Sequence, residues 1–256
     1  VAFAFMINDV EDAEDDALTP HKCRRNPVAA RDLSPFTARL MSFGVAAGSA
    51  LVYSTLGKTT FLLGMITLLI SFLYSWKPVR LKNIAFVDFF THGFMLSGLQ
   101  FLTGYFAFDP APFVHWIFPF LFIFCISCYG EMFNEMRDLD GDLKAGLKHT
   151  AAVLGPKVTT RLMGAMMVLA VISVIMTAFV IRLFTFWVLW LVFALSLIFI
   201  LPAVIRIRRN QNGIAMQESF QKPLEYAAAI ALGSHFSWPW ATQHVLPWLA
   251  AFRLLI

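Results

Sequence analysis

Apolar stretches of about twenty residues follow one another along the chain, separated by short polar segments. Stretches of this length fit α-helices that cross a hydrocarbon core of about 30 Å better than the weaker alternation of a β-barrel. The pattern predicts eight helical segments, at about residues 1–16, 34–56, 59–76, 84–108, 113–142, 157–181, 186–205 and 224–252. Ser34 and Pro35 have the chemistry of an N-cap and a first helical residue. We therefore expect an all-α, polytopic transmembrane helical bundle.

Composition supports a membrane protein. Hydrophobic residues make up 59% of the 256 positions and charged residues 14%, against about 45–50% and about 25% in soluble domains. In a membrane protein the net charge of +4 does not indicate a nucleic-acid partner. The placement of the basic residues along the chain is more informative, because it marks one side of the membrane. Cys23, Cys125 and Cys128 predict neither a disulfide framework nor a metal site. We expect a single domain over residues 1–256, with the lipid bilayer as its surroundings.

Basic residues mark one membrane face. If alternate loops lie on opposite sides, 17 of the 20 Lys and Arg residues fall on one side and only Lys58, Arg182 and Arg253 on the other. Cytoplasmic loops hold the excess of Lys and Arg in membrane proteins. The richly charged loops are therefore expected on the cytoplasmic side.

Two polar motifs with identical spacing follow apolar runs on that same side. The first motif is Asn8, Asp12 and Asp16, and the second motif is Asn134, Asp138 and Asp142. Residues at i, i+4 and i+8 of an α-helix share one face and rise about 12 Å. Four crossings separate the two helices, so they run parallel and their acidic ends emerge together. Each helix thus presents one carboxamide and two carboxylates as a stripe.

Two facing stripes would place at least four carboxylates around one cavity, which is repulsive without divalent cations. Mg²⁺ takes one or two carboxylates together with phosphate oxygens and waters, so a metal-bound diphosphate resolves the repulsion. Basic side chains near the motifs are candidates for the remaining phosphate charge. They are Lys22, Arg24, Arg25, Arg80, Lys82 and Lys144.

One face of the segment at 84–108 carries polar residues. Asp88, His92 and Gln100 are spaced by four and eight residues, and polar groups inside a membrane tend to face the bundle interior. We expect His92 and Gln100 on the acceptor side of the cavity, with interhelical hydrogen bonding as the alternative. Aromatic candidates for the cavity wall are Phe89, Phe90, Phe94, Phe101, Tyr105 and Phe133.

The order of these motifs along the chain resembles that of a known family. The carrying residues are the first motif, Arg25-Asn26-Pro27, the series Tyr74-Ser75-x-x-Pro78-x-Arg80-Leu81-Lys82, the second motif, and Lys144-x-Gly146 with Thr150-x-x-Val153-x-x-Gly155. Together they resemble the UbiA superfamily of intramembrane prenyltransferases. The resemblance implies nine transmembrane helices around a central cavity, with this chain matching the second through the ninth. The first helix and part of the second are then expected to be missing from residues 1–256.

The resemblance also implies an activity. The expected reaction is Mg²⁺-dependent transfer of a polyprenyl group from a prenyl diphosphate to a hydrophobic or aromatic acceptor, through an allylic carbocation. Asn8, Asp12, Asp16, Asn134, Asp138 and Asp142 become the metal residues. Asp12, Asp138, Lys82 and Asp88 become the catalytic residues. Lys22, Arg24, Arg25, Arg80 and Lys144 bind the diphosphate.

Two other classes of function compete with this interpretation. A membrane transporter also carries acidic residues and parallel repeats, but it predicts the acidic groups near the bilayer centre. A purely structural role gives no reason for two identical motifs. Among prenyltransferase acceptors, the residues do not select between aromatic acids, quinone precursors, tetrapyrroles, glycerol lipids and carotenoids.

Overall fold

A computed structural model describes residues 1–108, 113–144 and 146–181, with isolated positions beyond. The chain divides into two compact units, Val1–Ile181 and Arg182–Ile256, and the account below concerns the first. The segments predicted at 186–205 and 224–252 lie largely outside the described residues, although Trp190 and Ile230 within them are helical.

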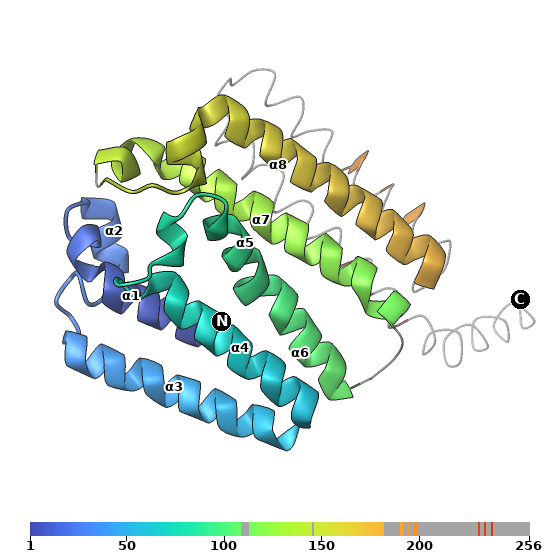
Figure 1. The fold of residues 1–256 in the computed structure, drawn as a ribbon, viewed down its shortest axis with the longest axis horizontal. Coiled ribbons are helices and arrows are strands. Elements are labelled where there is room, and N and C mark those ends of the chain that lie inside the picture. Colours follow the sequence, from blue (N-terminus) through green and yellow to red (C-terminus); the bar gives the residue numbers. More distant parts are fainter. Residues whose placement is uncertain are drawn as a thin grey trace, which may run out of the picture. The chain divides into compact units, whose positions relative to one another are not determined.

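The first unit is built from helices (Figure 1). In chain order these are α1 (Ala2–Asp16), α2 (Pro20–Arg25), α3 (Pro35–Thr55), α4 (Lys58–Ser75), the 3₁₀ turn η1 (Leu81–Asn83), α5 (Val87–Gly93), the π-helix η2 (Phe94–Gly98), α6 (Leu99–Phe108), α7 (Phe113–Lys144), α8 (Thr150–Met176) and the π-helix η3 (Thr177–Ile181). In the described part of the chain, four helices are long and apolar enough to cross a membrane. They span Pro35–Thr55, Lys58–Ser75, His115–Lys144 and Thr150–Val180.

Local sequence signals explain most helix ends. Ser34 Oγ accepts a hydrogen bond from Thr37 N at 3.1 Å, and Pro35 follows as the first helical residue, so the predicted N-cap of α3 is confirmed. Gly57, with φ of 104°, makes the tight turn from α3 into α4. Because a side chain at this φ would be strained, glycine is the natural residue there.

Three boundaries differ from the prediction. The basic segment after α1 contains a helix, α2, because Pro20 fits the first turn of a helix. The segment predicted at 84–108 begins as a helix only at Val87, after the 3₁₀ turn η1, and the π-helix η2 divides it into α5 and α6. Finally, α8 begins at Thr150 instead of near 157, and Gly155 kinks it with φ of 75°. The prediction placed Gly155 in the loop before this helix, whereas it forms a kink within α8.

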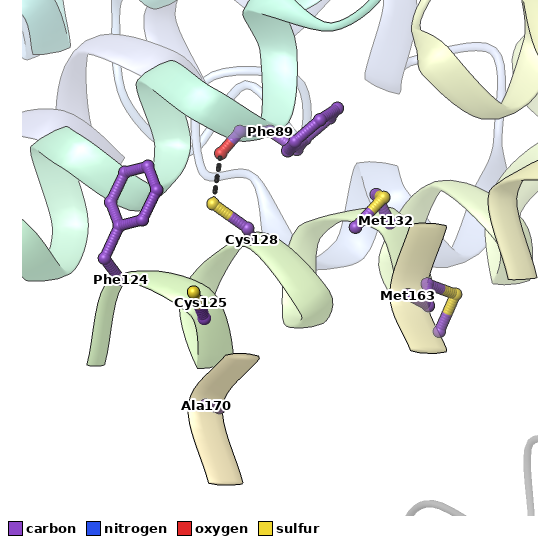
Figure 2. Close-up of a cluster of buried hydrophobic side chains, with 7 residues drawn as sticks. All are labelled: Phe89, Phe124, Cys125, Cys128, Met132, Met163 and Ala170. Atoms are coloured by element: carbon purple, nitrogen blue, oxygen red, sulfur yellow. Dashed lines mark hydrogen bonds between the residues drawn. The ribbon is translucent and has the colours of Figure 1, made fainter. Parts of the chain in front are cut away.

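A hydrophobic core joins α5, α7 and α8 (Figure 2). Its buried members are Phe89, Phe124, Cys125, Cys128, Met132, Met163 and Ala170. Cys128 Sγ donates a hydrogen bond to Phe89 O at 3.3 Å, and a Cβ at Gly93 would come within 2.6 Å of that sulfur. The two helices can approach this closely only because position 93 is glycine. This packing fixes the wall of the cavity described next.

Candidate active site

The first motif lies along α1 and lines a cavity of about 670 Å³ in the first unit. Lys82 Nζ donates hydrogen bonds to Asn8 Oδ1 at 2.8 Å and to Asp12. Arg80 donates to Asp12 Oδ1 at 3.1 Å and to Asp15 Oδ2 at 2.6 Å. The two basic residues therefore hold the carboxylates of α1 through direct ion pairs.

A buried asparagine fixes α2 against the end of α1. Asn26 is 2% exposed, and its Nδ2 donates to Asp9 O at 2.8 Å and to Asp16 Oδ2 at 2.9 Å. Its Oδ1 accepts from the backbone N–H groups of Val28 and Ala29. With all its side-chain atoms bonded, Asn26 is a local anchor that sequence reasoning did not single out as part of the site.

The second motif reaches the same cavity from α7. Asn134, Asp138 and Asp142 all line it, and Lys22 Nζ from α2 donates to Asp142 Oδ1 at 3.1 Å. Asp138 is paired with the adjacent Arg137 at 3.1 Å. The structure thus brings together two motifs that are 126 positions apart in the sequence, and Lys22, on the helix that follows α1, binds the last residue of the second motif.

The cavity carries an excess of negative charge. Seven carboxylates line it against four Lys and Arg side chains, Lys22, Arg80, Lys82 and Lys144, and the imidazoles of His92 and His149. The carboxylates are Asp12, Asp15, Asp16, Glu131, Glu135, Asp138 and Asp142. A diphosphate entering this cavity would therefore need further positive charge beside it.

Burial and ion pairing shift the pKa values of the lysines at the cavity edge. Burial lowers the pKa of Lys82, and the attraction of Asp12 offsets only part of this effect. For Lys22, burial also lowers the pKa, but its hydrogen bond to Asp142 and the nearby carboxylates outweigh burial and raise it. The pKa of Lys82 is therefore the lower of the two.

His149 lies beneath the second motif. Its Nδ1 is 3.3 Å from Glu135 Oε2 and its Nε2 is 3.3 Å from Asp142 Oδ2. Burial lowers the pKa of His149, but hydrogen bonds to Asp142 and Glu135 outweigh it and raise the pKa to about 9. His149 therefore links the second motif to the start of α8, where its Nδ1 accepts a hydrogen bond from Ala152 N at 3.3 Å.

Four predicted site residues do not line the cavity. Arg24 and Arg25 are exposed on α2. Gln100 Nε2 donates back to Met95 O at 2.9 Å, because the π-helix η2 shifts the register after His92. His92 itself does line the cavity, so the predicted polar face of this segment is only partly present.

Asp88 is the fourth predicted site residue that does not line the cavity, and its side chain is fully buried. Its carboxylate accepts hydrogen bonds from Thr150 Oγ1 at 2.6 Å, from Phe89 N at 2.7 Å and from Thr150 N. These bonds join the start of α5 to the start of α8. In this geometry Asp88 joins two helices and is absent from the cavity lining.

The predicted aromatic wall is also placed elsewhere. The six aromatic candidates from residues 89 to 133 are absent from the lining, and Phe89 belongs to the buried core. Among described residues, the aromatic rings that line the cavity are Phe5, Tyr74 and the imidazoles of His92 and His149. Phe89 faces α7 because α5 packs directly against that helix.

The lining contains polar residues that sequence reasoning missed. On α7, Glu131 precedes the second motif and Glu135 lies within it. Tyr74 is the last residue but one of α4. The spacing of Glu131, three residues before Asn134, places both on one helical face. That signal was available in the sequence, whereas the arrival of His149 from the loop after α7 was not.

The donor set fits Mg²⁺ shared with a phosphate ligand. Within the described ranges, no three His, Cys, Asp or Glu side chains form a ready-made metal site. The two motifs offer only carboxylate and carboxamide oxygens, which suit a hard cation, and Mg²⁺ commonly takes one or two carboxylates plus phosphate and water. The residues therefore fit a metal that arrives with a diphosphate.

Comparison with known proteins gives one family and several relatives. Residues 1–220 match the model of the UbiA prenyltransferase family. A digeranylgeranylglyceryl phosphate synthase from Methanopyrus kandleri is 26% identical over 156 residues, which cover 60% of this chain and 54% of that protein. The chain therefore aligns with about half the length of this curated relative.

Solved structures share the fold. A UbiA homolog from Archaeoglobus fulgidus bound to GPP and Mg²⁺ matches with a TM-score of 0.64 and 21% identity, covering 92% of this chain and 82% of that one. The same homolog bound to DMAPP and Mg²⁺ gives a TM-score of 0.58 at 21% identity, with 90% and 70% coverage. A digeranylgeranylglyceryl phosphate synthase structure gives 0.64 at 20% identity, covering 91% and 79%.

Proposed function

The chain belongs to the UbiA prenyltransferase family, and on that basis we propose that it is a membrane prenyltransferase. The proposed reaction moves a polyprenyl group from a prenyl diphosphate to a hydrophobic or aromatic acceptor. The protein is an integral membrane protein, with four described helices of sufficient length and hydropathy to cross a bilayer. Its relatives support the donor, because the Archaeoglobus fulgidus homolog binds GPP or DMAPP with Mg²⁺.

The observation that carries the proposal is the meeting of both motifs at one cavity with surplus negative charge. Asn8, Asp12 and Asp16 would hold one Mg²⁺, and Asn134, Asp138 and Asp142 another. Mg²⁺, when bound, would neutralise phosphate charge and so favour departure of the diphosphate.

The basic residues have a second use in this reaction. Arg80 and Lys82, now paired with Asp12 and Asp15, can turn from carboxylate to phosphate oxygens when the donor enters. Lys22 can do the same from Asp142. They would then stabilise the negative charge that develops on the leaving diphosphate as the allylic C–O bond breaks. Ala4, Phe5, Met95 and Leu96 supply apolar lining that limits water near the carbocation.

Diphosphate release from geranylgeranyl diphosphate tests the function. We expect release by the wild-type protein in the presence of Mg²⁺ and its loss with EDTA. Asp12→Asn and Asp138→Asn should each lower the rate by about 10²-fold or more, the range for losing one transition-state contact. Asp32→Asn is the matched control, because Asp32 is exposed and outside the cavity lining. Wild-type rates in both motif variants would contradict the assignment of Asp12 and Asp138 to Mg²⁺. Cation flux across the membrane without diphosphate release would favour a transporter.

We also propose that the motif face is cytoplasmic, which the distribution of basic residues supports. Cys23, half-buried in α2, reports on that face. A membrane-impermeant maleimide should label it only after cells are opened, with Cys125→Ser and Cys128→Ser present to remove the buried thiols. Labelling of intact cells would reverse the assigned orientation.

A further inference from the structure

A second polar group lines the cavity away from the ends of the two motifs. Tyr74 from α4, His92 from α5 and Glu131 from α7 all line it. Tyr74 Oη donates to Glu131 Oε1 at 2.5 Å, and His92 Nε2 lies 3.3 Å from Glu131 Oε2. His92 Nδ1 is 3.3 Å from Ser127 Oγ. Glu131 is thus held by groups from two other helices.

Along α7 this group lies one turn before Asn134 and farther from the two carboxylates of the second motif. Glu131 precedes Asp138 by seven residues and Asp142 by eleven, which separates them by about 10 and about 16 Å along the helix. The neighbouring lining from η2 is apolar, Met95 and Leu96. Glu131 therefore lies on the side of the cavity that leads from the charged motif ends toward apolar surroundings.

The ion pairs of Glu131 differ from those of the carboxylates that pair with Lys22, Arg80 and Lys82. The printed ion pairs of Lys22, Arg80 and Lys82 go to Asp142, Asp12 and Asp15, and in the described residues Glu131 pairs only with His92. A carboxylate without a cationic Lys or Arg partner repels phosphate. Its side chain is 16% exposed, and a largely buried carboxylate is costly unless it is used or well bonded.

The bonding of Glu131 leaves one oxygen available. Oε1 receives the short bond from Tyr74, whereas the contact of Oε2 with His92 is long at 3.3 Å. A carboxylate oxygen has room for two hydrogen bonds. An amphiphilic alcohol could place its hydroxyl at Oε2 and its hydrocarbon body against Met95 and Leu96.

We propose that Glu131 is the catalytic base that takes the proton from an acceptor hydroxyl, and that Tyr74 and His92 are positioning residues. The inference rests on the proposed prenyl transfer. In the step, the allylic C–O bond breaks and the diphosphate leaves with the electron pair. The acceptor oxygen forms the new C–O bond with its lone pair, and its proton moves to the Glu131 carboxylate. Solvent later removes that proton and restores the base.

The test compares two rates in the same preparation. The first is diphosphate release from geranylgeranyl diphosphate without acceptor, which reports donor ionisation. The second is transfer to a long-chain monoalkyl glycerol ether, an amphiphilic alcohol, measured by the prenylated product. Glu131→Gln should lower transfer by about 10²-fold or more, the usual contribution of a general base, and leave acceptor-free release unchanged. Glu14→Gln is the matched control, because Glu14 is exposed and does not line the cavity.

Chemical rescue separates a base from a structural carboxylate. In Glu131→Ala, added formate should restore transfer and leave acceptor-free release unchanged. Tyr74→Phe and His92→Asn keep Glu131 and should lower transfer less than Glu131→Gln does, with kcat affected more than the KM of the alcohol. A structural role alone would not respond to formate.

Three results would overturn the proposal. If Glu131→Gln lowered diphosphate release and transfer equally, Glu131 would have a role in donor binding or in the fold. If the variant kept both rates, Glu131 would not be a catalytic base. Wild-type protein that releases diphosphate but does not prenylate the alcohol, including one that prenylates only the ring of 4-hydroxybenzoate, would exclude an alcohol acceptor. Absence of wild-type release would instead reject the proposed function itself.

Discussion

Asp88 provides the sharpest test of the structural interpretation. It is fully buried, and its carboxylate accepts hydrogen bonds from both the hydroxyl and the backbone N–H of Thr150. Thr150 Oγ1 in turn accepts from Phe86 N at 2.7 Å. Because these contacts join α5 to α8 outside the cavity, we expect substitutions here to alter stability and not the chemical step.

The magnitude follows from the bonds that are lost. Thr150→Val removes a hydrogen bond to a charged group, worth about 1.5–3 kcal/mol, and leaves the N–H of Phe86 without its partner, at about 1 kcal/mol or more. The expected loss in free energy of unfolding is therefore about 2.5–4 kcal/mol. Asp88→Asn removes the charge and turns an amide toward the N–H of Thr150, so a loss of similar size is expected. Because both variants break the same contact, the double variant should cost less than the sum of the two.

Thermal unfolding in detergent measures the stability of each variant. Diphosphate release, measured well below the unfolding transition and expressed per folded molecule, measures catalysis. Both single variants should unfold at lower temperature and retain the wild-type rate. An Asp88→Asn protein with unchanged stability and a strongly reduced rate would refute this reasoning and return Asp88 to a catalytic role.

Further variants test the anchors around the cavity. Asn26→Ala removes four hydrogen bonds and should lower stability by about 2–4 kcal/mol, seen as faster tryptic cleavage within α2 and as a lower unfolding temperature. Lys22→Gln should raise the KM for geranylgeranyl diphosphate by about tenfold, as for one lost charge-assisted bond of about 1.4 kcal/mol. Arg24→Gln is the control and should leave the KM unchanged, because Arg24 is exposed outside the cavity lining. Equal effects of the two variants would contradict the placement of α2. Gly93→Ala should cost about 1–3 kcal/mol by overpacking, and Cys128→Ala should relieve part of that cost if the close contact is the cause.

Sequence reasoning succeeded where a periodic signal reported directly on local structure. Apolar stretches predicted α3, α4 and the long α7, and the N-cap at Ser34 is present as expected. The i, i+4, i+8 spacing of the two motifs placed each on a single helical face. These predictions needed only helical geometry, because lipid-facing and cavity-facing residues differ in polarity along one helix.

The same reasoning failed where a local pattern had two structural solutions. Asp88 and His92 are both polar and lie four residues apart, on one face of a regular helix. Asp88 nevertheless binds Thr150, whereas His92 lines the cavity. Gln100 fits the same stripe only if the helix stays regular, and η2 removes that regularity. A buried carboxylate is satisfied either by a ligand or by a distant N–H and hydroxyl, and the choice depends on which helix packs against it.

The sequence by itself determined that this is a helical membrane protein with two oxygen-rich stripes at helix ends, and the order of its motifs resembled the UbiA family. Hydrophobic length, helical period and the placement of charge are local properties, so they can be read without knowing which helices touch. Only the tertiary structure decided that Lys22 and His149 bind Asp142 and that Tyr74 and His92 bind Glu131. These contacts join residues from different helices, and their energies depend on burial and distance, which exist only once the chain is packed.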